Sequence, residues 1–387
     1  MRGGPQGVVE LLQALVRVPS VNPDGVTGTV VENTGEAAMV EWLGGFLRGL
    51  GAEVSEDEVL PGRANVIGRF ASGGGGNKPV VVLAPHTDTV GVGGMVVEPF
   101  GGDVRGGRLW GRGACDTKGT MAAMLWALKE LGADGIAGLG CEVWFVGLMG
   151  EEWGQDGSKD FAKRYAGEVD FALVGEPTGC GAVVRTKGAL WPTLKTKGVA
   201  VHSSMPERGE NAILKMVRAL EVLDGDFREM LKREEWGDAM LGYSTLNIGV
   251  IAGGARSNIV PDGCEAKLDV RMTPAFYAAG GGEVLRAFLA ERAPEVELTM
   301  PVPSPPLATD LGNPFVKVLG ESGAAMGGAP WFSDASWLSA GGIASAIAGP
   351  GDIAQAHTVD EWIDLGELER GVGFYRGFLE KCGTGVE

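Results

Sequence analysis

Apolar residues recur at helical spacing in two stretches near the start of the chain. In residues 9–16 they lie three or four positions apart, with Glu10 and Gln13 between them. Residues 34–51 repeat this pattern over a longer stretch. A period of about 3.6 residues is typical of helices that bury one face. We therefore expect an amphipathic helix in each stretch.

Uninterrupted apolar runs follow, and they alternate with helical segments. Residues 80–83, 141–148 and 170–174 are almost entirely apolar, and each runs into a turn that contains proline or glycine. Runs of this kind are typical of strands covered on both faces of a sheet. Short strands are also expected near 53–56 and 65–69, and a helix of small and apolar residues at 121–131. This alternation predicts an α/β domain with a mixed sheet flanked by helices.

The pattern changes at about residue 181. Strands are expected at 182–185 with 191–201, then at 243–252, 264–271 and 296–300, and helices at 211–223 and 282–291. The order along the chain is therefore strand, helix, strand, strand, helix, strand. This order is typical of a small ferredoxin-like α+β domain. The proline-rich segment 301–306 is expected to be the return linker, and an apolar strand follows at 345–348. The chain is thus expected to form one α/β domain from residues 1–180 and 302–387, with a second domain, 181–301, inserted.

Composition narrows the possible partners. The chain has 387 residues, more than one hydrophobic core usually supports, so two domains are expected on length as well. With 50 acidic and 33 basic side chains, the formal net charge is −17. Nucleic acids and anionic membranes require basic patches, so this charge argues against both as partners. No apolar run approaches the length of a transmembrane helix.

The cysteines and the N-terminal segment favour a cytoplasmic location. The five cysteines are widely spaced and form no C-x-x-C pair. An odd number of such cysteines in a large chain is typical of reduced thiols in the cytosol. The N-terminal segment lacks the continuous apolar core of a signal peptide, because Glu10 and Gln13 interrupt it.

Six polar side chains fall in turns just past an apolar run or in glycine-rich connections: His86, Asp116, Glu151, Glu152, Glu176 and His357. The carboxyl ends of strands in an α/β sheet are where loops converge to build sites. An unpaired charge beside a buried strand is costly, and a divalent cation offsets that cost. Two imidazoles with three carboxylates suit Zn²⁺, Co²⁺ or Mn²⁺ better than Ca²⁺ or Mg²⁺. Only three histidines occur in the chain, and two lie in these loops.

His86 and Asp88 form the tightest pair among these candidates. They are two residues apart just after the run 80–83, and in extended backbone this spacing places both side chains on one side. His86 can then bind a metal through one ring nitrogen while Asp88 accepts a hydrogen bond from the other. An isolated pair of this kind is more often a histidine at a strand end in a surface loop, so the rest of the chain must decide.

Five motifs in series resemble those of the co-catalytic zinc peptidase and deacylase family. They are HTD at 86–88, GRGACDTKG at 111–119, GEE at 150–152, GEPT at 175–178 and AHTVDE at 356–361. That family contains acetylornithine deacetylase, succinyl-diaminopimelate desuccinylase, aminoacylases and glutamate-releasing carboxypeptidases. The motifs span nearly the whole chain in the family's order. The resemblance implies an enzyme that hydrolyses a linear amide.

The resemblance also implies a cofactor of two divalent metal ions, with Zn²⁺ expected and Co²⁺ or Mn²⁺ as alternatives. His86, Asp116 and Glu176 would hold one ion. Glu152, His357 and the shared Asp116 would hold the other. A single carboxylate that bridges two cations is the usual arrangement of two-metal sites.

Further roles follow from the same resemblance. Asp88 matches the residue behind the metal-binding His86, and Glu151 matches the general base that takes a proton from a metal-activated water. The peptide bond between Asp116 and Thr117 matches one that is cis in the family.

In the inserted domain, the resemblance covers three residues. His202 resembles a lid histidine that reaches into the partner subunit's site and hydrogen-bonds the oxyanion, so a homodimer through this domain is implied. Asn258 and Arg271 match residues that bind the substrate carboxylate, for which an arginine fork is well suited. The competing interpretation of His202 is a half-buried lid histidine without a catalytic role. For Asn258 and Arg271 it is the ordinary polarity of strand ends.

The expected substrate is a small N-acyl amino acid. Segments 331–335 and 349–357 look most like acetylornithine deacetylases, which favours N²-acetylornithine. Succinyl-diaminopimelate, another N-acyl amino acid and a dipeptide remain as alternatives, because Pro85 and Gly91 depart from the family's common pattern beside the ligands. Two other classes also remain open, a metal-free binding or scaffold relative and an aminopeptidase of a neighbouring di-zinc family.

Overall fold

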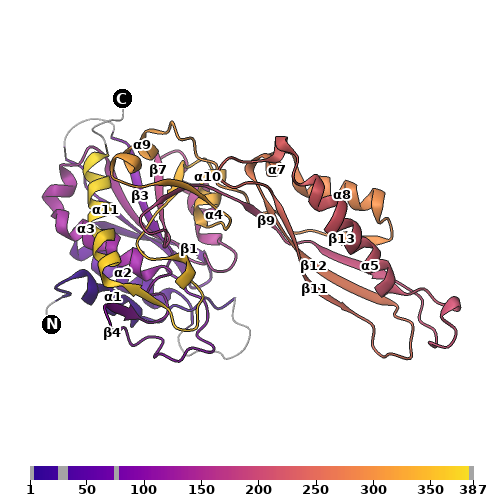
Figure 1. The fold of residues 1–387 in the computed structure, drawn as a ribbon. Helices are drawn as coiled ribbons and strands as arrows, with labels where there is room; N and C mark the ends of the chain where they lie inside the picture. Colours follow the sequence, from indigo (N-terminus) through magenta and orange to yellow (C-terminus); the bar gives the residue numbers. More distant parts are fainter. Residues whose placement is uncertain (1–3, 25–33, 74–77, 383–387) are drawn as a thin grey trace. The chain divides into compact units, whose positions relative to one another are not determined.

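The structure is a computed structural model that describes residues 4–24, 34–73 and 78–382. The chain divides into two compact units (Figure 1). The first unit comprises Met1–Val184, Thr309–Gly327 and Ser333–Glu387, and the second comprises Arg185–Ala308 and Gly328–Phe332. Both ends of the chain therefore contribute to the first unit, and the second is an insertion. The α/β fold with an inserted α+β unit agrees with the prediction from sequence.

The first unit is built on an eight-stranded mixed sheet, with strand order β1-β2-β6-β3-β7-β15-β8-β14. Its strands are β1 (Glu53–Leu60), β2 (Arg63–Phe70), β3 (Val80–Pro85), β6 (Glu142–Gly147), β7 (Phe171–Gly175), β8 (Ala182–Thr186), β14 (Met326–Ala329) and β15 (Ser345–Ile347). The neighbours β6, β3, β7 and β15 run parallel to one another. Strands β1, β2 and β8 pair antiparallel with their neighbours. The carboxyl ends of the central parallel strands therefore share one edge.

Helices cover the sheet of the first unit on both faces. They are α1 (Val8–Val16), α2 (Ala37–Gly49), α3 (Lys118–Ala137), α4 (Asp156–Tyr165), α9 (Pro314–Glu321), α10 (Asp334–Ala340) and α11 (Leu365–Lys381). Helices α1, α2, α3, α9 and α11 pack with alternate strand residues, such as Val81 and Leu83, in one large core. Helices α4 and α10 pack together on the opposite face (Figure 1). All six residues of β3 are buried, because helices cover both of its sides.

A small three-stranded sheet in the first unit joins distant parts of the chain. Its strands β4 (Asp103–Arg105), β5 (Arg108–Trp110) and β16 (Trp362–Asp364) follow the order β16-β5-β4 and are antiparallel. The pairing of β16 with β5 brings the glycine-rich segment 111–119 beside the segment 356–361. This contact matters for the candidate site, because each segment carries a candidate residue.

The second unit has the ferredoxin-like order. Its elements are β9 (Gly188–Leu190), β10 (Thr193–Lys197), α5 (Ala212–Val222), α6 (Arg228–Met230), β11 (Thr245–Gly253), β12 (Gly263–Met272), α7 (Pro274–Ala278), α8 (Gly281–Arg292) and β13 (Val296–Thr299). The antiparallel sheet has the order β11-β12-β10-β13, with β9 also paired to β12. Its own core lies between this sheet and helices α5 and α8.

One strand lies in a different sheet from the one expected. Residues 182–185 were assigned to the inserted domain, but β8 pairs with β15 of the large sheet. The two units accordingly separate after Val184 and again after Ala308, slightly beyond the expected boundaries after residues 180 and 301, and Gly328–Phe332 also belongs to the second unit. The alternating burial of β8 is typical of antiparallel strands in either kind of sheet, so the local pattern cannot identify its partner. Across the described ranges, every helix is too short or too polar to span a bilayer.

Candidate active site

Three neighbouring strands place most of the candidate residues at one edge of the large sheet. His86 directly follows β3, the pair Glu151 and Glu152 follows β6, and Glu176 follows β7. Because β6, β3 and β7 are adjacent and parallel, these turns converge on the same edge. The side chains that were 90 residues apart in sequence are therefore brought together, as the apolar pattern predicts.

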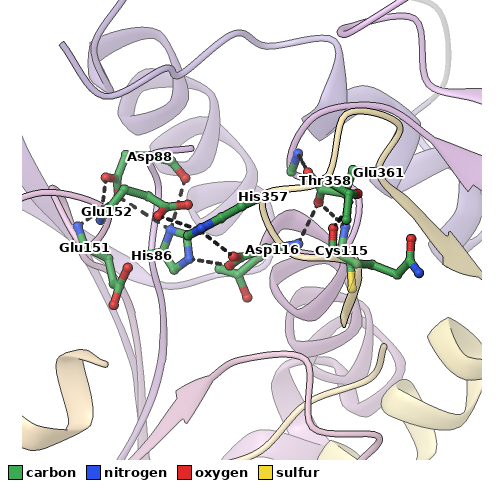
Figure 2. Close-up of polar contacts among 12 residues, drawn as sticks. His86, Asp88, Cys115, Asp116, Glu151, Glu152, His357, Thr358 and Glu361 are labelled. Atoms are coloured by element: carbon green, nitrogen blue, oxygen red, sulfur yellow. Dashed lines mark hydrogen bonds and ion pairs between the residues drawn. The ribbon is translucent and has the colours of Figure 1, made fainter. Parts of the chain in front are cut away.

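His86 is buried, with only 2% of its surface exposed. Its Nε2 lies 3.0 Å from Asp116 Oδ1, and its Nδ1 lies 3.0 Å from the carbonyl oxygen of Asp88 (Figure 2). The Asp88 carboxylate is slightly farther from Nδ1, at 3.5 Å. Asp88 thus lies behind the imidazole, with its carbonyl oxygen closer than its carboxylate.

The Asp88 carboxylate instead organises the turn after β6. Its two oxygens accept hydrogen bonds from the backbone N–H groups of Glu151 and Glu152, both at 3.0 Å. Asn22 Nδ2 donates a third bond, at 2.8 Å. Burial acts to raise the pKa of Asp88, but His86 and these donors outweigh it and hold that pKa below its usual range. Sequence reasoning did not single out Asn22, which lies far from every motif.

Asp116 is held in place through its backbone. Glu361, which is fully buried, accepts the N–H groups of Cys115 at 2.7 Å and Asp116 at 2.8 Å through Oε1 (Figure 2). Its Oε2 accepts the Gly113 N–H at 3.0 Å and Arg112 Nη1 at 2.7 Å. The peptide bond from Asp116 to Thr117 is cis. Glu361 was missed as a site residue, although it ends the motif at 356–361.

His357 also lies beside Asp116, next to the carboxylate oxygen that His86 does not contact. Its Nε2 lies 2.9 Å from Glu152 Oε2 and 3.4 Å from Asp116 Oδ2. His357 has a left-handed backbone, with a φ of 60°, and it lies in the connection that leads to β16. The two imidazoles therefore flank one carboxylate, each beside a different oxygen atom (Figure 2).

Two sets of three side chains present atoms that are all within 4.8 Å of one another. One set is His86, Asp116 and Glu152, and the other is His86, Glu151 and Glu176. Glu176 thus shares a set with His86, one of the two residues grouped with it from sequence, while Asp116 belongs to the other set. In this structure Glu176 is also close to the candidate base Glu151. Such spacing of imidazole and carboxylate atoms is suited to cation binding.

The three remaining candidates lie in the second unit. His202 is exposed, and its Nδ1 lies 2.8 Å from Ser204 Oγ. Asn258 is close to it, because its carbonyl oxygen accepts the Ser203 N–H at 3.1 Å. Arg271 on β12 forms an ion pair of 2.8 Å with Asp269. Its guanidinium also lies under 6 Å from the rings of Trp191 and Phe332. The roles implied for these three residues stay predictions.

Comparison with known proteins identifies the family. The family model described as Peptidase family M20/M25/M40 matches residues 82–381, most of the chain. The chain belongs to peptidase family M20/M25/M40. It is an enzyme, a hydrolase of the peptidase class.

Relatives of known name are similar over almost the whole length. An acetylornithine deacetylase from Proteus mirabilis is 30% identical over 376 residues, which cover 93% of each chain. One from Erwinia tasmaniensis is 29% identical over 370 residues, 92% of each.

Solved structures share the fold. A tripeptidase from Staphylococcus aureus superposes with a TM-score of 0.79 at 23% identity, covering 98% of both chains. A Bacillus subtilis protein described as a dinuclear metal-binding peptidase superposes with a TM-score of 0.71 at 15% identity, again over 98% of both.

The charge balance of the cluster fits the metal ions of family M20. Burial, and next the charge of Glu176, raise the pKa of Glu151 well above its usual value. Burial and Asp116 likewise raise the pKa of Glu176 and, less strongly, of Glu152. Glu152 Oε1 is also buried without a hydrogen-bond partner. Crowded carboxylates of this kind are costly unless cations are present, so the residues fit a pair of divalent ions.

Metal binding should tighten as the pH rises. Hydrogen bonds from His357 to Asp116 and Glu152 raise its pKa to about 10, so near pH 7 the imidazole carries a proton that a metal must displace. Each displaced proton makes the apparent affinity rise about tenfold per pH unit. We expect the Kd for Zn²⁺ to fall about 100-fold from pH 6 to pH 8 for one such proton. Competition with a chromophoric chelator measures it.

A pair of variants provides the control for this pH dependence. His357→Ala should lower the slope of affinity against pH by about one proton. His202→Ala should leave the slope as in the wild type, because His202 is not assigned to either ion. An affinity that is the same at pH 6 and pH 8 would contradict the expectation.

Proposed function

We propose that this enzyme hydrolyses the amide bond of an N-acyl amino acid, with N²-acetylornithine as the preferred substrate. The observation that carries the proposal is the position of Asp116 between His86 and His357, with Glu151 in the same cluster. The relatives named acetylornithine deacetylase support this choice of substrate. A cytoplasmic location belongs to the same proposal and is supported by the cysteine pattern.

Five side chains would hold two divalent ions, for which Zn²⁺ is proposed. His86, Asp116 and Glu176 are assigned to one ion, and Glu152, His357 and the shared Asp116 to the other. When bound, such a pair of ions polarises the scissile carbonyl and lowers the pKa of water.

Glu151 is proposed as the general base. Its raised pKa suits a carboxylate that must both accept and release a proton near neutral pH. It takes a proton from water as the water oxygen bonds to the carbonyl carbon. It then gives this proton to the amine nitrogen as the carbon–nitrogen bond breaks. Asp88 holds the Glu151 backbone N–H and so limits the movement of the base.

Residues of the second unit would bind the ends of the substrate. The Arg271 guanidinium can bind a carboxylate through two parallel hydrogen bonds, and Asn258 can add an amide donor. His202 would stabilise the oxyanion of the tetrahedral intermediate, in trans if the enzyme is a dimer. The exposure of His202 and Asn258 leaves both side chains available for such contacts.

A homodimer through the second unit is part of the proposal. Strand β11 is at one edge of its sheet, and Val250 and Ile251 on it are about half exposed. Leu214 and Val217 on the neighbouring helix α5 are exposed as well. An exposed apolar edge strand is suited to pairing with a second copy.

The dimer proposal predicts the effect of one substitution. Ile251→Glu should shift the mass measured by light scattering from dimer to monomer, because it places charge on the exposed edge. Val302→Glu, at a position 82% exposed outside this surface, is the matched control and should stay dimeric. A monomeric wild type at micromolar concentration would rule out the proposed assembly.

Removing the base should abolish turnover but not metal binding. We expect Glu151→Gln to lower kcat about 10²- to 10⁴-fold, the usual range for loss of general-base catalysis, while the metal content stays at the wild-type value. Steady-state kinetics and elemental analysis measure the two effects. Glu168→Gln, at an exposed position of the same unit, is the control. Wild-type turnover in Glu151→Gln would remove Glu151 from the mechanism.

A substrate panel tests the function itself. The panel contains N²-acetylornithine, N-succinyl-diaminopimelate, other N-acetyl amino acids, and dipeptides and tripeptides with free amines. Each is assayed with added Zn²⁺, Co²⁺ or Mn²⁺. We expect the highest kcat/KM for N²-acetylornithine. Faster cleavage of free-amine peptides would contradict the proposal and favour a peptidase.

A further inference from the structure

A buried glutamine connects the candidate base to a second set of polar side chains. Gln155, which is 7% exposed, donates a hydrogen bond from Nε2 to Glu151 Oε1 at 3.2 Å. Its Oε1 accepts a hydrogen bond from Trp337 Nε1 at 2.9 Å. Gln155 precedes α4 and Trp337 lies on α10, so two packed helices meet at this amide.

The contact with Trp337 determines which way the amide of Gln155 faces. The indole Nε1 is a donor only, so the atom it contacts must be the amide oxygen. The amide NH₂ group then faces Glu151, where it can donate to a carboxylate. Turned by half a rotation, the same amide would present its oxygen to the Glu151 oxygen, and two acceptors would repel each other. Trp337 therefore selects the orientation that Glu151 needs.

The backbone of Gln155 is held in an unusual conformation. With φ 55° and ψ 34° it is left-handed, which is uncommon for a residue with a side chain. Its N–H donates to the Gly150 carbonyl oxygen at 2.8 Å. Ser158 Oγ lies 3.1 Å from the Gln155 carbonyl oxygen and 2.6 Å from Asp334 Oδ1. Ser158 and Asp334 are both fully buried. Strained residues held in this way cluster at functional sites.

The side chain of Gln155 serves the site and not the helix. It makes no capping hydrogen bond to α4, although it occupies the position before the first helical residue. A residue needed only to begin the helix would favour Asp, Ser, Thr or Asn, whose short side chains bond the first N–H groups. Gln155 instead spans the distance between Trp337 and Glu151.

We propose that Gln155 is a positioning residue for Glu151, and that Trp337 acts through Gln155 by orienting its amide. The inference rests on the proposed role of Glu151 as general base. Because Gln155 binds Oε1 of Glu151, it directs Oε2 toward the water. A base misplaced by about 1 Å can cost about 100-fold in rate, so one hydrogen bond of this kind has a large effect on kcat.

Two conservative variants test the proposal. Gln155→Met keeps the length of the side chain and removes the donor, and Trp337→Phe keeps an aromatic ring and removes the indole N–H. We expect kcat to fall about 10- to 100-fold in the first and less in the second. KM and metal content should stay within about twofold of the wild type. Gln13→Met and Trp126→Phe remove similar hydrogen bonds elsewhere in the unit and should keep the wild-type kcat.

A double-mutant comparison separates positioning from a general structural effect. Since Trp337 acts through Gln155, Trp337→Phe should cause no further loss of kcat in the Gln155→Met background. In a Glu151→Gln background, single-turnover rates with excess enzyme should also be unchanged by Gln155→Met. Losses that multiply in either comparison, or a wild-type kcat in Gln155→Met, would overturn the inference.

The same measurements distinguish failure of the inference from failure of the proposed function. If Glu151→Gln retains wild-type turnover, the general-base assignment fails, and the inference fails with it. If Glu151→Gln is inactive while Gln155→Met has normal kcat, only the positioning role of Gln155 fails.

Discussion

The structure depends on one carboxylate that lies between two imidazoles. Asp116 contacts His86 through one oxygen and His357 through the other, while Glu152 contributes a further negative charge beside His357. Bringing these groups together in a buried site is unfavourable for the carboxylates, as the raised pKa values of Glu152 and Glu176 show. A pair of divalent cations would reverse this balance. The rest of the unit can be understood as the scaffold that makes this crowding possible.

That scaffold holds Asp116 by its backbone, so that its carboxylate can contact the two imidazoles. Glu361 accepts hydrogen bonds from the backbone N–H groups of Cys115 and Asp116 and pairs with Arg112. Burial raises the pKa of Glu361, and Arg112 opposes that effect. A buried carboxylate is tolerated here because charged and backbone donors surround it. The sheet formed by β16 and β5 brings Glu361 to this loop from the far end of the chain.

Buried side chains also restrain the turn that carries Glu151 and Glu152. Asp88 holds the backbone of the turn that carries Glu151 and Glu152, and Gln155 contacts the Glu151 side chain. In both halves of the site, buried neighbours therefore restrain a candidate functional residue: Glu361 restrains Asp116, and Asp88 and Gln155 restrain Glu151. Such support is what keeps a reactive group within the narrow tolerance that catalysis requires.

The sequence by itself determined the central strands of the large sheet and the edge at which they end, but not helices α4, α9, α10 and α11. Uninterrupted apolar runs such as 80–83 indicate strands buried on both faces, and polar residues just after them must lie where parallel strands end. The ferredoxin-like order of the second unit also followed from the pattern. These features are local, since they depend on side chains close together along the chain.

Only the tertiary structure decided which distant segments of the chain contact one another. The pairing of β8 with the large sheet, the contact of Asn22 with Asp88, and the hold of Glu361 on the Asp116 backbone all join segments far apart in sequence. The orientation of Gln155 likewise depends on Trp337, 182 residues away. Hydrophobic periodicity indicates which face of a helix or strand is buried, but it does not indicate which other element covers that face. For this reason the candidate residues could be named from the sequence, whereas Asn22, Glu361 and Gln155, which help to hold them, could not.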